Sequence, residues 1–308
     1  MAKLRESRKW EEITIAVERK AVAMSDSTDQ IPVPLCFFAK QQNVRAVRFE
    51  RLISTGGIRQ EDREYVIVIS SRAAGAECAT TKEILTDSPM WNEFGPPLRF
   101  TIAHELAHML FYDLVPSGPN SALLAENPDK LECVCNRIAA SLLLPRSRLP
   151  PDLKQRRFDV DYIGQIIARF KVSAEAFLWR FANDDVKGIY KDCDGIIGLL
   201  RHGRNGWSIK ACLGRGVFTI PLLGNAKTDD VAKHLEGKGM EALRLPPAIE
   251  MSITSEGSGS CSVDFPWRDK VAPFALQWRR LYDYPHPRAV VFSLQTSGIL
   301  QQRTTLFA

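Results

Sequence analysis

The sequence lacks any apolar run long enough to span a bilayer, and no internal repeat or low-complexity tract is present. Its first ten residues are charged and contain no apolar segment, so we expect no signal peptide. The seven cysteines are odd in number and include no Cys-x-x-Cys pair, which argues for reduced thiols rather than a disulfide framework. These absences predict a cytosolic protein.

Composition is that of an ordinary globular protein, with 45% hydrophobic and 25% charged residues, and 308 residues leave room for two domains. The formal net charge of +5 lies in the C-terminal third. Residues 1–200 hold 27 Lys and Arg against 27 Asp and Glu, whereas residues 201–308 hold 14 against 9. Such a basic third is compatible with a polyanionic ligand, although many domains that bind none carry as much charge.

The most informative motif is His104-Glu105-Leu106-Ala107-His108. Pro97 suits the first turn of a helix, and residues 98–112 contain no Gly or Pro, so we predict a helix there. Side chains four residues apart share a helix face, so both imidazoles can reach one metal ion, with Glu105 close enough to act on its water as a general base. The alternative is a pair of surface histidines that bind no metal. The apolar residues of this helix recur at helical spacing and are predicted to face a core: Ile102, Leu106, Met109 and Leu110.

A catalytic zinc site usually has three protein ligands and one position open for water. A second helix is predicted from Asn127-Pro128, a good N-cap followed by a good first-turn residue, to the residue before Pro145. Glu132 shares one face of this helix with small and apolar residues, where a carboxylate is costly to bury unless it is paired or binds a metal. Glu132 is therefore the predicted third ligand, and a salt-bridged surface glutamate is the alternative.

Both helices resemble the ImmA/IrrE group of bacterial metallopeptidases. Arg99-Phe-Thr-Ile-Ala-His-Glu-Leu-Ala-His108 is similar to that family's FTxAHExxH helix. Glu132-Cys-Val-Cys-Asn-Arg-Ile-Ala-Ala-Ser-Leu-Leu-Leu-Pro145 is similar to its ExxxNxxAxxxLxP helix. The resemblance is densest over about residues 30–185, and residues 284–293 resemble the C-terminal domain of the radiation-response (IrrE/PprI) branch.

The resemblance implies an intracellular zinc endopeptidase that cleaves a helix-turn-helix repressor and so derepresses stress, DNA-damage or phage-defence genes. It implies Zn²⁺ bound by His104, His108 and Glu132, with Glu105 as the catalytic base. We expect an α+β fold with a helical, zincin-like peptidase core and a small β-sheet in residues 1–150 (core about 30–146). A helix-turn-helix-like helical segment would follow in residues 151–189, and a C-terminal α+β, GAF-like sensor domain in residues 190–308.

Around the motif helices, we predict a polar helix over residues 1–24, a short helix over residues 31–43, and strands over residues 45–54 and 65–71. Gly56-Gly57 is predicted to form the turn between the strands, and the edge of such a sheet can pair with a substrate segment as an added strand. Residues 71–97 are predicted to be a long connection that contains Cys78. A thiolate there can occupy the water position of a zinc site and inhibit the enzyme, although a small, partly buried thiol is the commoner role.

Residues 159–183 are predicted to form two helices around a turn at residues 171–173, with Ser173 as the second N-cap. The spacing is like that of a helix-turn-helix, but the second helix is mostly apolar, which favours a packing pair over a reader of bases. Beyond them we predict a hairpin of residues 196–200 and 207–212, strands at 217–223 and 289–294, and helices at 229–235 and 271–281.

Four residues near the C-terminus are candidates for binding nucleic acid or another signal: Trp278, Arg279, Arg280 and Arg288. Such side chains can stack on bases and neutralise phosphates, which makes single-stranded DNA a candidate activator and a small-molecule or redox signal the rival. An amphipathic core helix with arginines on its outer face explains the same residues.

Two classes of function follow from these patterns. The first is a zinc endopeptidase, with Tyr112 a candidate for stabilising the oxyanion by its position on the helix. The second is a non-proteolytic, zinc-stabilised regulator that binds a repressor or nucleic acid. Glu105 favours the enzyme, because a structural metal site has no use for a base beside it.

Overall fold

The computed structural model describes residues 2–53, 55–71, 82–115, 122–154, 159–182, 195–203, 206–215, 258–267, 270–281 and 289–296. Helices and strands are mixed in these residues, so the chain is an α+β protein with a small sheet. It divides into two compact units. Unit 1 comprises residues 1–149 and 169–180, and unit 2 comprises residues 150–168 and 181–308. The three-part division expected from the sequence stays a prediction.

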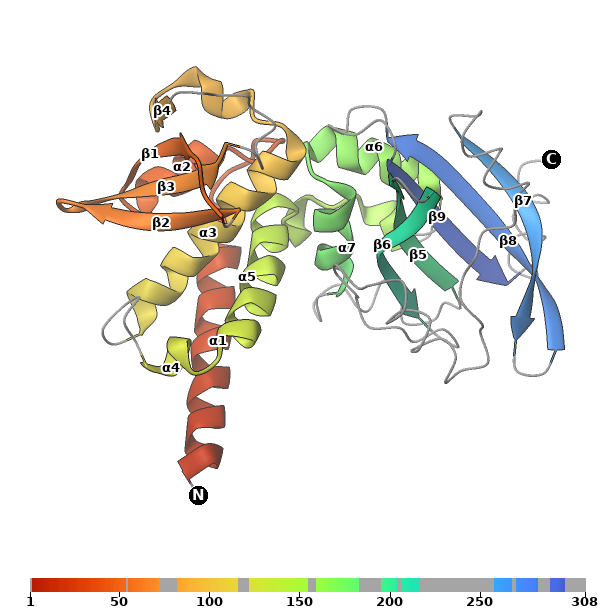
Figure 1. Ribbon diagram of the computed structural model, residues 1–308, viewed down its shortest axis with the longest axis horizontal. Helices are drawn as coiled ribbons and strands as arrows, with labels where there is room; N and C mark the ends of the chain where they lie inside the picture. The colour runs from red at the N-terminus through yellow and green to blue at the C-terminus, as the bar shows by residue number, and fades with distance from the viewer. Residues whose placement is uncertain are drawn as a thin grey trace. The chain divides into compact units, whose positions relative to one another are not determined.

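Three helices form the frame of unit 1: α1 (Ala2–Asp26), α3 (Pro96–Leu114) and α5 (Pro128–Leu143) (Figure 1). The predicted N-terminal helix and the two motif helices are therefore confirmed. The four apolar residues predicted to face the core from α3 are all at most 2% exposed. The ring of Trp10 on α1 stacks on Phe111 of α3, with centroids 5.8 Å apart. α1 is thus held against the helix that carries the motif.

A four-stranded sheet completes the N-terminal part of unit 1, with strands β1 (Val44–Glu50), β2 (Gly56–Glu61), β3 (Glu64–Ser70) and β4 (Lys82–Leu85) in the order β2-β3-β1-β4. β1 and β3 are parallel, and the two outer strands are antiparallel to their neighbours. The predicted turn at Gly56-Gly57 was wrong, because both residues pair with β3 and begin the edge strand β2. The chain reverses instead at residues 62–63, where Asp62 has a positive φ of 57°.

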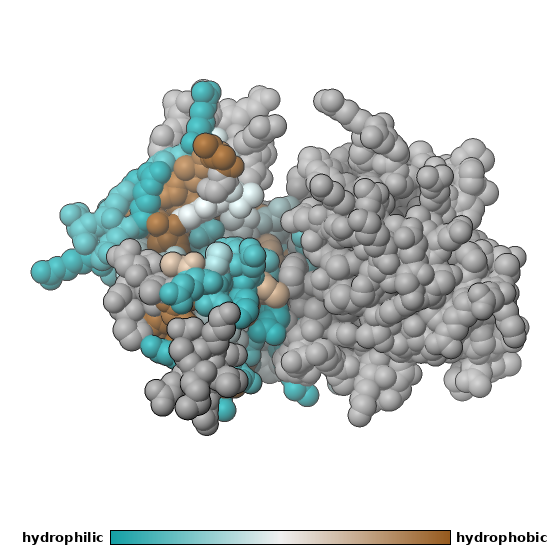
Figure 2. All heavy atoms as spheres, turned by 60° about the horizontal axis from the view of Figure 1, so that its bottom comes forward, coloured by the Kyte–Doolittle hydropathy of each residue, from teal (hydrophilic) through white to brown (hydrophobic). Residues whose placement is uncertain are grey.

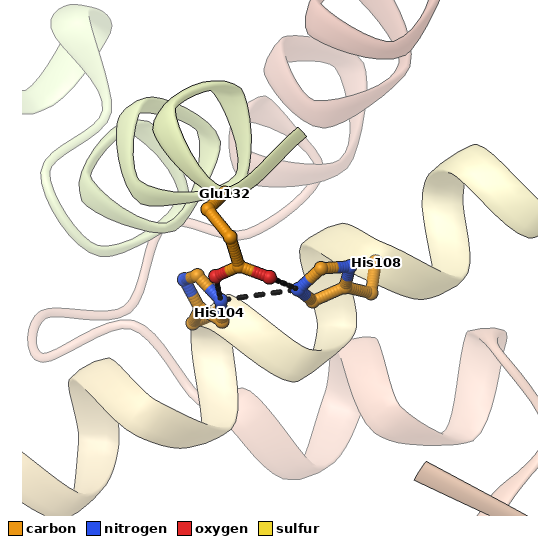
Figure 3. A group of neighbouring side chains, drawn as sticks. All are labelled: His104, His108 and Glu132. Carbon is orange, nitrogen blue, oxygen red and sulfur yellow. Dashed lines mark hydrogen bonds and ion pairs between the residues drawn. The ribbon is translucent and has the colours of Figure 1, made fainter. Parts of the chain in front are cut away.

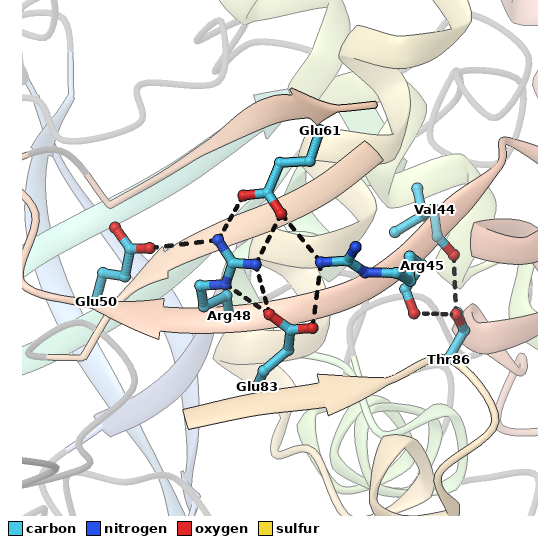
Figure 4. A network of polar contacts seen from close by, with 7 residues as sticks. All are labelled: Val44, Arg45, Arg48, Glu50, Glu61, Glu83 and Thr86. Carbon is cyan, nitrogen blue, oxygen red and sulfur yellow. Dashed lines mark hydrogen bonds and ion pairs between the residues drawn. The ribbon is translucent and has the colours of Figure 1, made fainter. Parts of the chain in front are cut away.

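Charged side chains from three strands form a network on one part of this sheet (Figure 4). Arg48 donates to Glu61 through both terminal nitrogens, at 2.5 and 2.9 Å, and to Glu83 through Nε at 2.7 Å. Arg45 also contacts both carboxylates. The hydrogen bond from Arg48 lowers the pKa of Glu61. These partly exposed ion pairs link β1 to β2 and β4 but add little to the stability of the fold, because solvent screens such charges.

Between β3 and α3, the predicted long connection contains more structure than expected. β4 pairs with β1, and the 3₁₀ helix η1 (Pro89–Asn92) follows with its first turn capped by Ser88 Oγ, which accepts a hydrogen bond from the Met90 amide. Trp91 of η1 is 1% exposed and belongs to the core. Cys78 lies outside the described residues. The short predicted helix before β1 is confirmed as α2 (Leu35–Gln41).

After the short helices α4 (Ala122–Ala125), η3 (Arg146–Arg148) and η4 (Pro151–Lys154), the predicted helical pair is present as α6 (Val160–Phe170) and α7 (Ala174–Ala182). Lys171 takes a positive φ of 49° between them, and Ser173 Oγ accepts a hydrogen bond from the Ala176 amide, as expected of an N-cap. Phe177 and Leu178 of α7 are fully buried. Burial of this helix favours the packing pair over a surface that reads bases.

Unit 2 contains a five-stranded antiparallel sheet in the order β6-β5-β9-β8-β7. Its strands are β5 (Gly195–Gly203), β6 (Gly206–Arg215), β7 (Ser258–Trp267), β8 (Lys270–Leu281) and β9 (Ala289–Thr296). The predicted β5–β6 hairpin and the strand at residues 289–294 are confirmed. The predicted strand at residues 217–223 and helix at residues 229–235 lie outside the described residues.

The predicted helix over residues 271–281 was wrong, because this segment is strand β8. Its burial alternates: Leu276 and Trp278 are buried, whereas Gln277 and Arg279 are half-buried. This alternation, with a period of two residues, is typical of a strand. In the sequence alone, a short apolar segment fits the helical period of about 3.6 residues as well. Pro273, which donates no ladder hydrogen bond, lies just before the stretch of β8 that pairs with β9.

On the face of the molecule in Figure 2, the described surface of unit 1 is largely hydrophilic, and hydrophobic areas lie between the hydrophilic ones. Large apolar side chains exposed in the described part of the chain include Ile15, Val22, Phe37, Ile53, Leu85 and Leu114. Among the helices that the structure describes, none is both long and apolar enough to cross a membrane.

Candidate metal centre

Helix α3 places the two motif histidines on one face. Gly95 precedes the helix and Pro96 and Pro97 occupy its first turn, where the amide that proline lacks would have no partner in any case. One turn separates His104 from His108, and their Nε2 atoms are 3.1 Å apart. Both side chains are largely buried, at 14% and 11% exposure. The helix therefore presents two imidazole nitrogens at a single point.

Helix α5 contributes Glu132 to the same point (Figure 3). One carboxylate oxygen lies 3.0 Å from His104 Nε2 and the other 3.2 Å from His108 Nε2. The Glu132 side chain is 56% exposed, so the expectation that it lies buried among apolar residues was wrong. Its side chain leaves the exposed flank of α5 and reaches across to α3. Hydrogen bonds from both histidines hold the pKa of the Glu132 carboxyl well below its usual range.

The three side chains together meet the requirements of a metal ion. Within the described residues, His104, His108 and Glu132 form a group whose ligand atoms all lie within 4.8 Å of one another. A tetrahedral ion with bonds of about 2.0–2.1 Å separates its ligand atoms by about 3.3 Å, close to the observed 3.0–3.2 Å separations. Two imidazole nitrogens and one carboxylate are also donors that zinc accepts, and three such ligands leave a fourth position open.

Asn136, one turn after Glu132 on α5, orients His104. Its Oδ1 lies 2.9 Å from His104 Nδ1, so that nitrogen can donate its proton to Asn136. With a metal bound, His104 Nε2 would give up its proton and its hydrogen bond to Glu132, and its lone pair would be directed to the metal. The sequence pattern includes this asparagine in the motif of the second helix but assigns it no role. Within the described residues, the buried Nδ1 of His108 has no hydrogen-bond partner.

Glu105 lies beside this group and is not part of it. It is 7% exposed, and burial raises the pKa of its carboxyl, with the nearby Glu132 acting in the same direction and the two histidines against it. Such a rise brings the pKa of a carboxyl closer to that of a proton-exchanging catalytic group. Gly56, the first residue of β2, packs directly against the Glu105 carboxylate.

Tyr112 lies one turn beyond His108 on α3, with ring centroids 6.3 Å apart. Burial raises the pKa of Tyr112 to about 12, and the charges of Glu105 and Glu132 add to the rise. The phenol thus stays protonated and able to donate a hydrogen bond. Tyr65 of β3 is near enough to add to the shift, and nothing in the sequence pattern pointed to it.

The residues predicted to bind nucleic acid belong to unit 2. Trp278 is 3% exposed and packs against Gly259, so its ring offers no face on which a base could stack. Arg279 forms an ion pair with Asp161 of α6 at 2.6 Å. The Arg280 side chain and Arg288 lie outside what the structure describes, as does the candidate inhibitory thiol of Cys78.

The site therefore defines a class: two histidines one turn apart on one helix, a carboxylate from a second helix, and a buried glutamate beside them. Residues 97–181 match the family model Peptidase_M78, the IrrE N-terminal-like domain, which supports the ImmA/IrrE family and a peptidase activity. The matched segment runs from the start of α3 to α7 and so contains every residue of the centre.

Two further comparisons add little. A solved structure described as a Mycobacterium tuberculosis transcriptional regulator is 16% identical, with a TM-score of 0.47, over 93% of this chain and 76% of that chain. At these values the similarity carries no argument about function. The comparison with curated proteins gives no match.

Proposed function

We propose that the protein is a zinc-dependent metalloendopeptidase. The observation that carries the proposal is the convergence of His104, His108 and Glu132 within bonding range of one ion, with Glu105 buried beside them. The family match over the same residues supports peptidase chemistry. A structural metal site would usually be closed by a fourth protein ligand, and these three leave a position open.

His104, His108 and Glu132 would hold the zinc. When bound, zinc would polarise the scissile carbonyl and lower the pKa of a water towards about 7. Glu105 takes the proton of the attacking water and returns it to the leaving amine, a role that suits its raised pKa. Tyr112, which stays protonated, is a candidate donor to the developing oxyanion.

The substrate that we propose is a helix-turn-helix repressor, as the family resemblance implies. Strand β2 supports an extended substrate segment, because it is the outermost described strand of its sheet and its first residue lies against Glu105. A repressor segment added to this edge would run past the catalytic centre. Cleavage would then require local unfolding of the repressor, since only an extended segment can pair with a strand.

Unit 2 is proposed to be a GAF-like sensor that gates the peptidase, with Cys78 a candidate inhibitory ligand. The basic charge of residues 201–308 supports binding of single-stranded DNA through the backbone, whereas the burial of Trp278 removes the support for stacking on that residue. We expect single strands to bind more weakly as salt rises and to stimulate repressor cleavage. Binding indifferent to salt, or cleavage unchanged by oligonucleotides, would instead favour a small-molecule signal.

The test of the proposed chemistry is the Glu105→Gln variant, assayed on candidate helix-turn-helix repressors. Glu105 is no ligand, so the variant should retain zinc while cleavage falls by about 10²- to 10⁴-fold. Glu126→Gln, which removes an exposed carboxylate just before α5, is the matched control and should cleave as the wild type does. Undiminished cleavage by Glu105→Gln would place the base elsewhere. A zinc-loaded wild type that cleaves nothing would favour the non-proteolytic regulator.

A further inference from the structure

The first residue of β2 is a glycine in a place where an added side chain would collide with the Glu105 carboxylate. A Cβ atom built on Gly56 would lie 2.8 Å from Glu105 Oε1 and 3.3 Å from Thr101 Cγ2, both on α3. Carbon and oxygen atoms that are not bonded do not normally approach within 3.0 Å, so a methyl group and the carboxylate cannot share this space. The space that Gly56 leaves empty is therefore occupied by the catalytic carboxylate.

The next residue provides the contrast. A Cβ on Gly57 would meet nothing within 4 Å, because successive residues of a strand point to opposite faces. Neither glycine has a backbone in the left-handed region that only glycine adopts easily. Both pair with β3, Gly56 with Ile69 and Gly57 with Val68. The two glycines thus differ in what an added side chain would touch.

We propose that Gly56 is a positioning residue for Glu105: the missing side chain of the edge strand sets where the carboxylate rests beside the metal centre. The inference rests on the proposed peptidase function. Glu105 is 93% buried and so has little room to move aside. The atom that a methyl group would displace is the tip of a side chain rather than backbone. The fold can therefore accept alanine at position 56, but the substitution would displace the carboxylate of Glu105, the proposed catalytic base.

The first experiment compares Gly56→Ala with Gly57→Ala in the full-length, zinc-loaded protein, with cleavage of a helix-turn-helix repressor that the wild type cleaves as the assay. For Gly56→Ala we expect kcat to fall on the order of 10- to 100-fold, since a displacement of about 1 Å can cost that much, while KM and zinc stoichiometry stay within about twofold. Gly57→Ala, on the same strand, should keep the wild-type kcat and zinc stoichiometry, and its KM measures what the strand itself contributes to substrate pairing. Equal kcat for the two variants would overturn the proposal, and a change confined to KM would show that the strand acts through substrate pairing instead.

A second experiment tests the contact without relying on activity. In the metal-free protein, Gly56→Ala is compared with Gly57→Ala by thermal unfolding, with Glu105 present and in a Glu105→Ala background. With Glu105 present, Gly56→Ala should have the lower Tm of the two; in the Glu105→Ala background this difference should vanish. A difference that persists without Glu105 would overturn the contact. An inactive wild type with the expected thermal coupling would overturn the peptidase function alone.

A third variant combines the change with a shorter carboxylate. In Glu105→Asp the oxygens retreat from β2, so adding Gly56→Ala should lower kcat by a smaller factor than it does in the wild type. An equal factor in both backgrounds would mean that Gly56 does not act through Glu105.

Discussion

At the scale of single residues, the centre combines one exposed carboxylate with one buried carboxylate. Glu132 reaches the histidines from the exposed side of α5, and their hydrogen bonds lower its pKa. Glu105 is buried without such a bond and its pKa rises. The carboxylate of Glu132 is thus suited to bind a cation, and the carboxyl of Glu105 is suited to exchange protons. The two side chains are chemically identical, and only their surroundings differ.

The burial of Glu105 carries a cost in stability that depends on pH. Its folded-state pKa is raised, so below the ordinary glutamate pKa of about 4.3 the group is protonated in both states and costs nothing. As the pH rises through that value, Glu105 ionises in the unfolded state before it ionises in the folded state. The free energy of unfolding therefore falls until the pH exceeds the folded-state pKa of Glu105. We therefore predict that metal-free Glu105→Gln has a higher Tm than the wild type at pH 7, and that the gain shrinks as the pH falls towards 4.

Thermal unfolding in the presence of a chelator measures this gain, with Glu126→Gln as the control that should show none. A gain that is equal at pH 7 and pH 4.5 would contradict burial of the charge as its cause.

At the scale of elements, the motif helix is held by a buried arginine. Arg99 is 2% exposed and donates to two backbone oxygens, Val33 O at 2.7 Å and Lys171 O at 3.2 Å. Burial lowers the pKa of Arg99 to about 10. The side chain thereby ties α3 to the segment before α2 and to the turn between α6 and α7. Two segments, one before α3 in the sequence and one after it, are therefore fixed to the helix that carries both histidines.

We predict that Arg99→Met destabilises the protein by about 1–3 kcal/mol, because the substitution removes the donor to the buried carbonyl oxygen of Val33 and to the partly buried one of Lys171. Urea unfolding of the metal-free protein measures the loss. Arg146→Met, at an exposed arginine of η3, is the control and should change stability by less than about 0.5 kcal/mol. A loss for Arg99→Met no larger than for Arg146→Met would contradict the anchoring role.

The elements differ in how far the sequence reveals them. The motif helices could be predicted because Pro96, Pro97 and Pro128 mark their starts and Pro145 the end of the second. Gly56-Gly57 was misread because a glycine pair usually signals a turn, whereas here one glycine is required by a carboxylate on a helix far along the chain. No local pattern contains that contact.

Some features of the candidate site could be predicted from the sequence, and others could not. The ligand set was predictable from spacing on two helices, since i and i+4 fix a common face. The exposure of Glu132 and the role of Asn136 were not, because both depend on how α5 packs against α3. Strand β8 was missed because a short apolar segment fits the helical period as well as the period of two that is typical of a strand.

At the scale of the whole molecule, the centre belongs to unit 1 alone. The ligands, Glu105, Asn136 and Gly56 all fall within residues 1–149, and the family match ends at residue 181, next to the last residue of unit 1. Zinc binding should therefore depend on unit 1, and any signal received by unit 2 should alter cleavage without altering the ligand set.

Titration of the metal-free protein with Zn²⁺, in competition with a chelating indicator, tests the central claim most directly. We predict one tightly bound zinc in the wild type, in Glu105→Gln and in Asp129→Ala, which removes an exposed carboxylate one turn before Glu132 on α5. Asn136→Ala should bind about 10- to 100-fold more weakly, because the hydrogen bond that orients His104 is lost. Glu132→Ala should bind more weakly still. Wild-type affinity in Glu132→Ala would contradict the account.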